Sequence, residues 1–117
     1  MEMVTQQSRL NDSLKTTITI SPKTFKFDTI QDNNHIRGMF FIKNTGNKDF
    51  NIVSITPSCD CIDVSFLKIK AIHSGDSLQV NYIMNINNKK GKFSNAIVAV
   101  GNCQFGNQTY FFTGYIF

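Results

Sequence analysis

The chain contains 117 residues, of which 41% are hydrophobic and 17% are charged, and its formal net charge at pH 7 is +4. This hydrophobic content excludes an intrinsically disordered chain, and the length suits a single domain whose core needs no disulfide in order to fold. No apolar run is long enough to span a membrane, and residues 1–15 lack the apolar core of a signal peptide.

The positive charge is spread along the chain and does not form a block. The one tight group is Lys89, Lys90 and Lys92, which flanks Gly91 in a predicted turn. A solvated hairpin tip accounts for such a group, and the spacing of the many aromatic residues fits a core. We therefore expect no nucleic-acid partner.

The first part of the chain is predicted to be a tail followed by an interrupted strand. Residues 1–14 are polar and lack a helical apolar period, so we expect a flexible N-terminal tail ahead of one domain over residues 15–117. The β-branched segment Thr16 to Ile20 precedes Pro22, after which apolar and polar residues alternate. Because proline has no amide hydrogen for a central strand, we predict an edge strand that Pro22 interrupts.

The middle of the chain is predicted to form strands joined by tight turns. Residues 36–42 carry apolar side chains on both faces, which is typical of a central strand. Residues 44–47 read Asn-Thr-Gly-Asn, and because Asn and Gly tolerate positive φ we predict a hairpin connection there. The next strand runs over residues 50–55, and its apolar faces switch, so we expect a bulge or kink near Ile52.

Further strands are predicted in the second half. Residues 62–66 and 78–86 alternate between apolar and polar side chains, as half-buried strands do. Residues 93–100 and 109–117 follow as apolar and aromatic strands. Short strands separated by turn signals, with no convincing helix, indicate an all-β fold, an antiparallel β-sandwich of about seven strands.

Two cysteines lie one residue apart near the middle of the chain. In an extended strand Cys59 and Cys61 would point to the same face. Their Cα atoms would lie at or beyond the upper limit for an unstrained disulfide, so a bridge needs a bend, which Pro57 and Ser58 could supply. A disulfide closing so small a ring would be strained and comparatively reducible, as redox-active bridges are. The alternative is a pair of half-buried packing residues at a strand end.

The same cysteines are the candidates for metal binding and for catalysis. Two thiolates could bind copper or zinc, with His73 or Cys103 completing the ligand set. A catalytic site would need Cys59 or Cys61 together with His73 and an aspartate such as Asp63. Nothing in their spacing favours this, and no glycine-rich loop opens a helix. We therefore expect no enzyme, no catalytic residues, and no cofactor other than the alternative of copper or zinc.

Four motifs resemble the DUF1573 family over roughly residues 25–117. They are Phe40-Phe41-Ile42-Lys43-Asn44-Thr45-Gly46, Ser58-Cys59-Asp60-Cys61, Ser74-Gly75-Asp76 and the closing strand with Gly114. Asp60 and Ser74 depart from the family pattern, which has glycine and proline at those places, and Cys103 is not part of it.

The resemblance carries expectations about fold and location. It implies an immunoglobulin-like sandwich similar to the ASH, major sperm protein and PapD group. It also implies an exported bacterial protein, periplasmic or associated with the outer membrane, often a lipoprotein with its anchor upstream of such a domain. The biochemical function of the family is generally unassigned.

The closing strand offers a candidate surface for a partner. Phe111, Tyr115 and Phe117 alternate with the other large residues of this strand, so one set can lie outside when the other lies in the core. Exposed, they would form an apolar patch suited to a protein partner; buried, they would pack under loops or the second sheet. We therefore expect a non-enzymatic interaction module with a protein partner. The alternative function is thiol–disulfide or soft-metal chemistry at the paired cysteines.

Overall fold

The computed structural model describes residues 14–30, 35–87 and 89–117, so the predicted tail lies outside the described residues except for Leu14. The described residues form nine strands and no helix, and they therefore contain no helix that could cross a membrane. The strands are β1 (Ile18–Ser21), β2 (Thr24–Ile30), β3 (His35–Asn44), β4 (Phe50–Pro57), β5 (Ile62–Phe66), β6 (Ala71–Ile72), β7 (Ser77–Asn85), β8 (Gly91–Gly101) and β9 (Gln108–Ile116).

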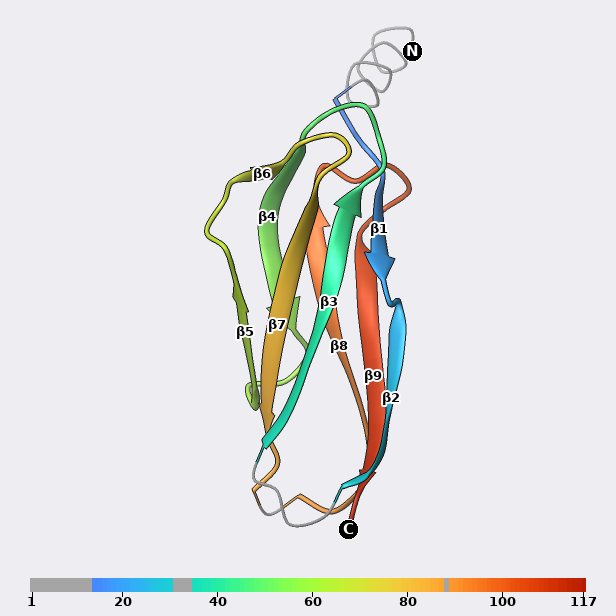
Figure 1. Ribbon diagram of the computed structural model, residues 1–117, viewed down its shortest axis with the longest axis vertical. Coiled ribbons are helices and arrows are strands. Elements are labelled where there is room, and N and C mark those ends of the chain that lie inside the picture. The colour runs from blue at the N-terminus through green and yellow to red at the C-terminus, as the bar shows by residue number, and fades with distance from the viewer. Residues whose placement is uncertain (1–13, 31–34, 88) are drawn as a thin grey trace, which may run out of the picture.

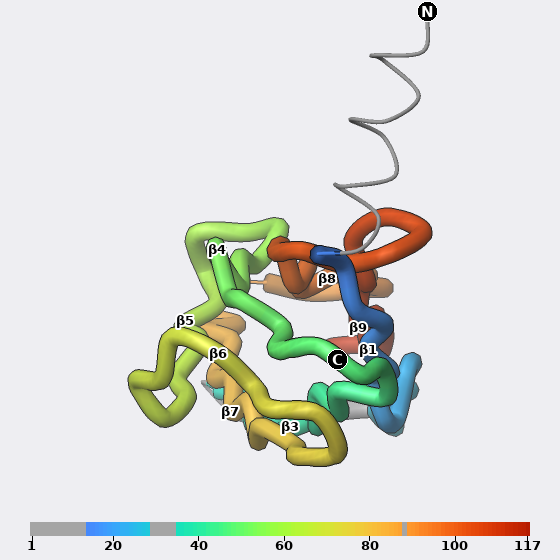
Figure 2. Tube along the Cα trace, turned by 90° about the horizontal axis from the view of Figure 1, so that it is seen from above, coloured from blue at the N-terminus to red at the C-terminus, as the bar shows by residue number. Residues whose placement is uncertain are grey.

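The strands pack as two sheets lying face to face (Figures 1 and 2). One sheet has the order β1-β3-β7-β5 and the other has the order β2-β9-β8-β4-β6. The prediction of an all-β sandwich is confirmed. Every pairing between named strands is antiparallel except that of β2 with β9, which is parallel.

The predicted edge strand is confirmed, and proline divides it between the two sheets. β1 ends at Ser21 on an edge of the first sheet, and β2 begins at Thr24 on an edge of the second. Pro22 lies between them, where its missing amide hydrogen costs no ladder bond. This division, together with the two-residue β6, accounts for nine strands where about seven were expected.

The bulge expected in β4 is also present, since the register with β8 shifts between Ile52 and Ser54. The predicted hairpin over residues 44–47 is wrong. β3 and β4 belong to different sheets, so the segment between them crosses the sandwich and does not return along the same sheet.

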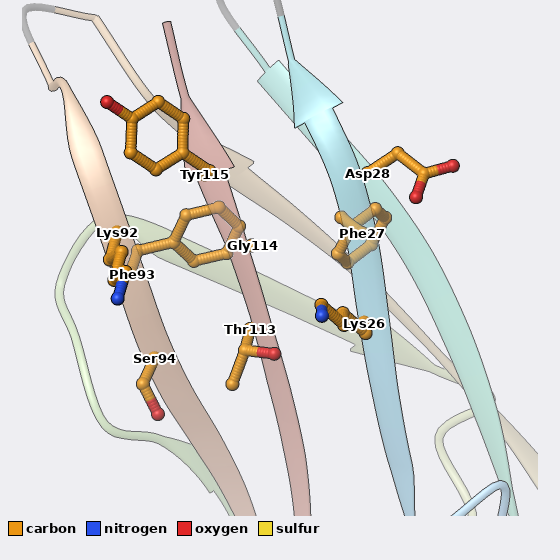
Figure 3. Close-up of a pocket in the computed structure, with 9 residues that line it drawn as sticks. All are labelled: Lys26, Phe27, Asp28, Lys92, Phe93, Ser94, Thr113, Gly114 and Tyr115. Atoms are coloured by element: carbon orange, nitrogen blue, oxygen red, sulfur yellow. The ribbon is translucent and has the colours of Figure 1, made fainter.

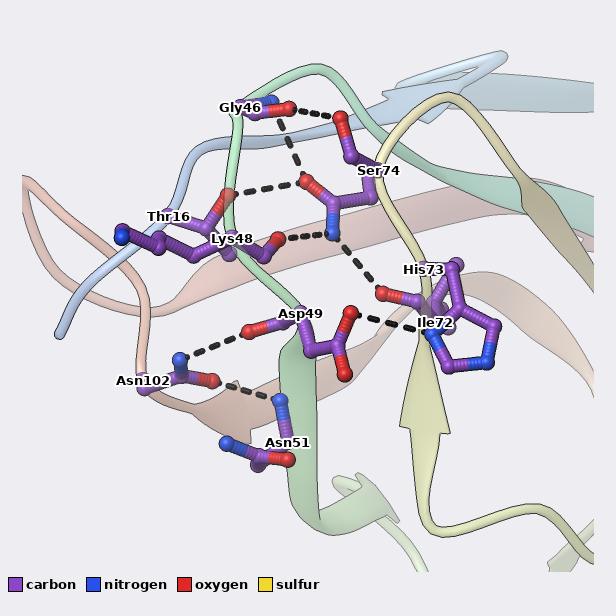
Figure 4. Close-up of polar contacts among 10 residues, drawn as sticks. Thr16, Gly46, Lys48, Asp49, Asn51, Ile72, His73, Ser74 and Asn102 are labelled. Atoms are coloured by element: carbon purple, nitrogen blue, oxygen red, sulfur yellow. Dashed lines mark hydrogen bonds and ion pairs between the residues drawn. The ribbon is translucent and has the colours of Figure 1, made fainter.

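The reason is the side chain of Asn44, which is fully buried where β3 ends. Its Nδ2 donates to the carbonyl oxygens of Lys48 at 2.6 Å and Ile72 at 2.8 Å. Its Oδ1 accepts from the Thr16 hydroxyl at 2.9 Å and from the Gly46 amide at 3.0 Å (Figure 4). One side chain thus ties the segment before β1, the crossover and β6 together, replacing the ladder bonds of a hairpin.

The centre of the core is an aromatic cluster drawn from both sheets. Phe40 of β3 stacks on Tyr110 of β9 with ring centroids 4.3 Å apart, and Tyr82 of β7 stacks on Phe112 of β9 at 4.6 Å. All four side chains are at most 1% exposed. The hydroxyls of Tyr82 and Tyr110 hydrogen-bond to each other at 2.5 Å, and burial raises the pKa of both. The cluster is therefore apolar with one internal polar contact that satisfies both of its members.

The Tyr82–Tyr110 contact gives a stability prediction. Replacing Tyr110 by Phe leaves the Tyr82 hydroxyl buried without its partner, which should lower the free energy of unfolding by about 1–3 kcal/mol. The double variant Tyr82→Phe/Tyr110→Phe should recover part of that loss, because no orphaned hydroxyl remains. Urea unfolding measures both, with the half-exposed Tyr115→Phe as control. A single variant no less stable than this control would contradict the assignment.

Asn44 gives a second prediction. Asn44→Ala removes four hydrogen bonds at a buried position, and the unfolding free energy should fall by at least about 3 kcal/mol. Asn47→Ala lies in the same crossover on an exposed residue and should change it by less than about 0.5 kcal/mol. The measurement is the denaturant midpoint of the two variants. Equal midpoints would show that the hydrogen bonds of Asn44 do not stabilise the fold.

Candidate functional site

The paired cysteines lie in a tight turn, residues 58–61, which we call the cysteine turn. It joins β4, in the five-stranded sheet, to β5, in the four-stranded sheet. The sulfurs of Cys59 and Cys61 are bonded at 2.04 Å, and their Cα atoms are 5.1 Å apart. The chain bends from Ser58 onward, immediately after Pro57, which brings the Cα atoms within the range that a disulfide spans.

Backbone hydrogen bonds tether this turn to the two sheets. The Ser58 amide donates to the Ala96 carbonyl at 2.8 Å, and the Ala96 amide donates to the Ser58 hydroxyl at 3.0 Å. On the other side, the Asn85 amide donates to the Cys61 carbonyl at 2.8 Å. The position of the disulfide is therefore fixed by β8 and by β7.

The disulfide is half-buried, and it borders a hollow of about 510 Å³ that we call the lysine hollow. The sulfurs pack against the core on one side, as the packing alternative expected. On the other side, Lys89, Lys90 and Lys92 share the lining of the hollow with Cys59 and Cys61. The hairpin tip predicted for this lysine group is wrong, because β7 and β8 belong to different sheets and Lys92 lies within β8. The group lies beside the cysteine turn instead.

His73 does not lie near the cysteines, so the ligand set proposed from the sequence needs correction. β6 pairs Ile72 with Phe50 at the start of β4, whereas Cys59 follows the end of β4 at Pro57. The structure therefore places His73 and the two cysteines at opposite ends of this strand. In the disulfide neither sulfur is a thiolate, and the described part of the chain has no group of three His, Cys, Asp or Glu residues placed to hold a metal. The catalytic combination with His73 is separated in the same way.

Cys103 also lies away from the cysteine turn. It follows Gly101, which pairs with Ile52 near the start of β4, and it forms an isolated bridge with Thr16. It is a free thiol, 6% exposed, and burial raises its pKa. A buried thiol with a raised pKa is inert, so Cys103 acts as a core residue.

His73 belongs to a polar cluster that the sequence did not predict. Its Nδ1 lies 3.0 Å from Oδ1 of Asp49 on the crossover (Figure 4). Asn102 joins this cluster by donating to the Asp49 carbonyl at 2.9 Å and accepting from the Asn51 amide at 2.6 Å. With Asn44 and Thr16, these residues form what we call the polar junction. Of them the sequence singled out only Asn44, as part of a motif, and His73, as a candidate ligand.

The three aromatic residues of the closing strand lie on the outside. Phe111, Tyr115 and Phe117 are 45%, 42% and 67% exposed, and we call them the aromatic face. The other residues of the alternation, Tyr110, Phe112 and Ile116, are buried. Tyr115 and Phe117 make an edge contact at 6.3 Å.

A second hollow, of about 660 Å³, adjoins the aromatic face at Tyr115 (Figure 3). Gly114 lies in its lining, and the ring of Phe93 occupies the place of the missing side chain, since a Cβ at Gly114 would lie 2.6 Å from that ring. Lys26 and Lys92 also line this hollow. Aromatic surface and positive charge therefore occur together here, with Asp28 as the carboxylate among the lining residues.

The chain belongs to the DUF1573 family, whose model, described as a protein of unknown function, matches residues 18–116. No curated protein matches it in sequence. A protein of unknown function from Porphyromonas gingivalis W83 is similar in structure, with a TM-score of 0.71 and 11% identity over 86% of this chain and 47% of that one. PapD-like domain 7 of human CEP192, an ASH domain, is similar with a TM-score of 0.64 and 13% identity over 88% and 87%.

The secreted serine protease VesC of Vibrio cholerae also contains this fold, with a TM-score of 0.64 and 11% identity over 92% of this chain and 24% of that one. The chain thus spans less than half of the Porphyromonas protein and about a quarter of VesC. The expected relation to PapD-like domains is confirmed at the level of the fold.

The pair of His73 and Asp49 predicts a pH effect at the polar junction. The hydrogen bond and the charge of Asp49 raise the pKa of His73 above 6.5, with a smaller contribution from Asp76. A raised pKa in the folded state means that any stabilisation by the pair is present below pH 6.5 and is lost as the pH rises through the raised value. An NMR titration should give His73 a pKa above 6.5 that falls towards this value in Asp49→Asn. An unchanged titration would contradict the contact.

Proposed function

We propose that this member of the DUF1573 family is a non-enzymatic interaction module of an exported protein. The observation that carries the proposal is the aromatic face, because three large aromatic side chains are exposed on the outward alternation of β9 and the residue that follows it. Tyr115 and Phe117 are in ring contact, and clusters of exposed apolar side chains are typical of protein-binding surfaces. Aromatic residues are also the side chains that contribute most at protein interfaces.

The charge beside the aromatic face favours a partner segment that is both acidic and apolar. Lys26 and Lys92 line the hollow that reaches Tyr115, against the single carboxylate of Asp28. The full chain carries a formal net charge of +4 at pH 7. Complementary charge speeds encounter and fixes orientation, while the aromatic rings provide the buried area.

Export is supported by the disulfide. Disulfides persist in oxidising compartments and are rare in a reducing cytosol, so a bridge between Cys59 and Cys61 fits a periplasmic or extracellular location. The secreted protein VesC offers a precedent for this fold outside the cell.

Binding to the aromatic face can be tested with labelled peptides. A fluorescein-labelled peptide of alternating Asp and Phe should bind the wild-type domain more tightly than one of alternating Lys and Phe. Phe111→Ser/Tyr115→Ser should weaken binding of the acidic peptide roughly tenfold, because two interface aromatics are lost. Fluorescence anisotropy measures the dissociation constants.

The matched control removes the same kind of surface from the opposite sheet. Met39→Ser/Phe41→Ser deletes two side chains that are 46% and 37% exposed on β3. This variant should bind like the wild type. Equal weakening by both variants, or no preference for the acidic peptide, would contradict the proposal.

A second function, thiol–disulfide exchange at Cys59 and Cys61, is favoured by the position of the bridge. The sulfurs lie beside an open hollow, where an incoming thiol can reach them. A loop of so few residues restricts the unfolded chain little, by about 1–2 kcal/mol, so the bridge contributes less stability than disulfides closing long loops. Because the bridge contributes little to the free energy of unfolding, its reduction during exchange would leave the domain folded.

The double variant Cys59→Ser/Cys61→Ser tests this second function. It should stay folded, with a loss of about 1–2 kcal/mol, and it should no longer oxidise an added thiol. Cys103→Ala should retain the exchange, since this thiol is buried away from the turn. Consumption of thiol followed with a chromogenic disulfide reports the activity. If the double variant does not fold, the bridge is structural and the second function is wrong.

A further inference from the structure

The charged residues that line the lysine hollow beside the disulfide are all positive. Lys89, Lys90 and Lys92 line it together with both cysteines. Its other described lining residues are Met84, Gly91, Phe93, Ser94, Asn95 and Ile116, and none of them carries a carboxylate side chain. Asp60, between the two cysteines, is exposed and does not line the hollow. A molecule approaching the sulfurs through this hollow therefore meets three positive charges.

The two sulfurs of the bridge also differ from each other. The amide of Cys61 lies 3.1 Å from Sγ of Cys59 and donates a hydrogen bond to it. A hydrogen-bond donor stabilises a thiolate, and the sulfur with the more stable thiolate is the better leaving group. Sγ of Cys59 is therefore the better leaving group when a thiolate attacks Sγ of Cys61.

We propose that the lysine hollow makes the Cys59–Cys61 bridge an exchange site for thiols that carry carboxylates. This inference rests on the second function proposed above and names its substrate class. Lysines at the entrance attract an anionic thiol, and their charge also favours thiolates at the reacting sulfurs. A partner thiol with positive charge beside it is repelled from the same entrance.

Reduction of the bridge takes place in two successive thiol–disulfide exchanges. The thiolate of the first thiol attacks Sγ of Cys61, a mixed disulfide forms, the Cys59–Cys61 bond breaks, and its electron pair leaves on Sγ of Cys59. A second thiolate attacks the substrate sulfur of the mixed disulfide and releases the oxidised dimer of the substrate, with Sγ of Cys61 leaving as a thiolate. Two thiols are oxidised, the bridge is reduced by two electrons, and the two protons of the thiols pass to the cysteines or to solvent.

The test compares thiols of different charge on the full chain. Glutathione and a cysteine peptide flanked by aspartates are anionic, N-acetylcysteine amide is neutral, and cysteamine is cationic. Rates of bridge reduction are measured by mass spectrometry after acid quenching and alkylation, at equal thiolate concentration and low ionic strength. The wild type should react roughly tenfold faster with the anionic thiols than with cysteamine. In about 1 M salt, where screening acts over about 3 Å, this preference should largely vanish.

Two triple variants of equal net charge isolate the lysines. Lys89→Gln/Lys90→Gln/Lys92→Gln should reduce the preference for anionic thiols to about twofold or less. Lys43→Gln/Lys68→Gln/Lys70→Gln removes three exposed lysines that do not line the hollow and should keep the preference. A faster reaction of glutathione than of the peptide assigns the site to small thiols, and the reverse order assigns it to acidic protein segments; both support the substrate class.

The outcomes separate this inference from the function on which it rests. Exchange that is equally fast with all four thiols, or a preference unchanged by the first triple variant, would overturn the role of the lysines and leave exchange itself standing. A wild-type bridge that no thiol reduces would overturn both. The order of attack has its own readout, since Cys59 in Cys61→Ser should have a lower thiol pKa than Cys61 in Cys59→Ser, and the reverse order would overturn the assignment of the leaving group.

Discussion

The hydrogen bond between Tyr82 and Tyr110 is the constraint around which the sandwich is built. It joins a strand of each sheet at the centre of the core, where any hydroxyl without a partner would be costly. The stacked rings of Phe40 and Phe112 fill the space around it. Among the described residues no buried side-chain nitrogen or oxygen lacks a hydrogen-bond partner. Because the buried polar groups have hydrogen-bond partners within the core, we look for chemistry and recognition on the surface and in the turns.

The two ends of the sandwich carry different groups of side chains. At one end the polar junction closes the loops with neutral amides and the pair of His73 and Asp49, and its contacts serve the fold. At the other end lie the cysteine turn and the lysine hollow. Lys92 lines both this hollow and the one beside Tyr115, so the two hollows adjoin. A partner held on the aromatic face would have the bridge within reach, which joins the two proposed functions in one region.

Much of the fold could be predicted because alternation is a local property of the chain. The buried face of β7, the bulge at Ile52 and the division at Pro22 all follow from residues close together in sequence. Which sheet a strand joins depends on distant partners, and this is where prediction failed. Asn44 followed by Thr and Gly has the local chemistry of a hairpin turn, but hydrogen bonds to the distant residues Thr16 and Ile72 hold it in a crossover. The parallel pairing of β2 with β9 could not be predicted either, because these strands are far apart in the sequence.

The candidate site was predicted in part. The spacing of Cys59 and Cys61 and the need for a bend after Pro57 could be deduced from the sequence, as could the alternation that would leave the aromatic face outside. The distance between His73 and the cysteines could not, because β6 pairs with the far end of β4. The position of the lysines beside the disulfide could not be predicted either, since Lys89 and Cys61 are far apart along the chain.

Both the proposed chemistry and the proposed location depend on the state of the cysteines, which the intact mass of the natively purified protein reveals. The protein is alkylated without reduction, once folded and once unfolded, and the products are mapped by peptide. We expect a mass two hydrogens below that of the fully reduced chain and a bridge between Cys59 and Cys61. The one free thiol, Cys103, should be alkylated only when the protein is unfolded. Three alkylated thiols, or a bridge that includes Cys103, would contradict this expectation.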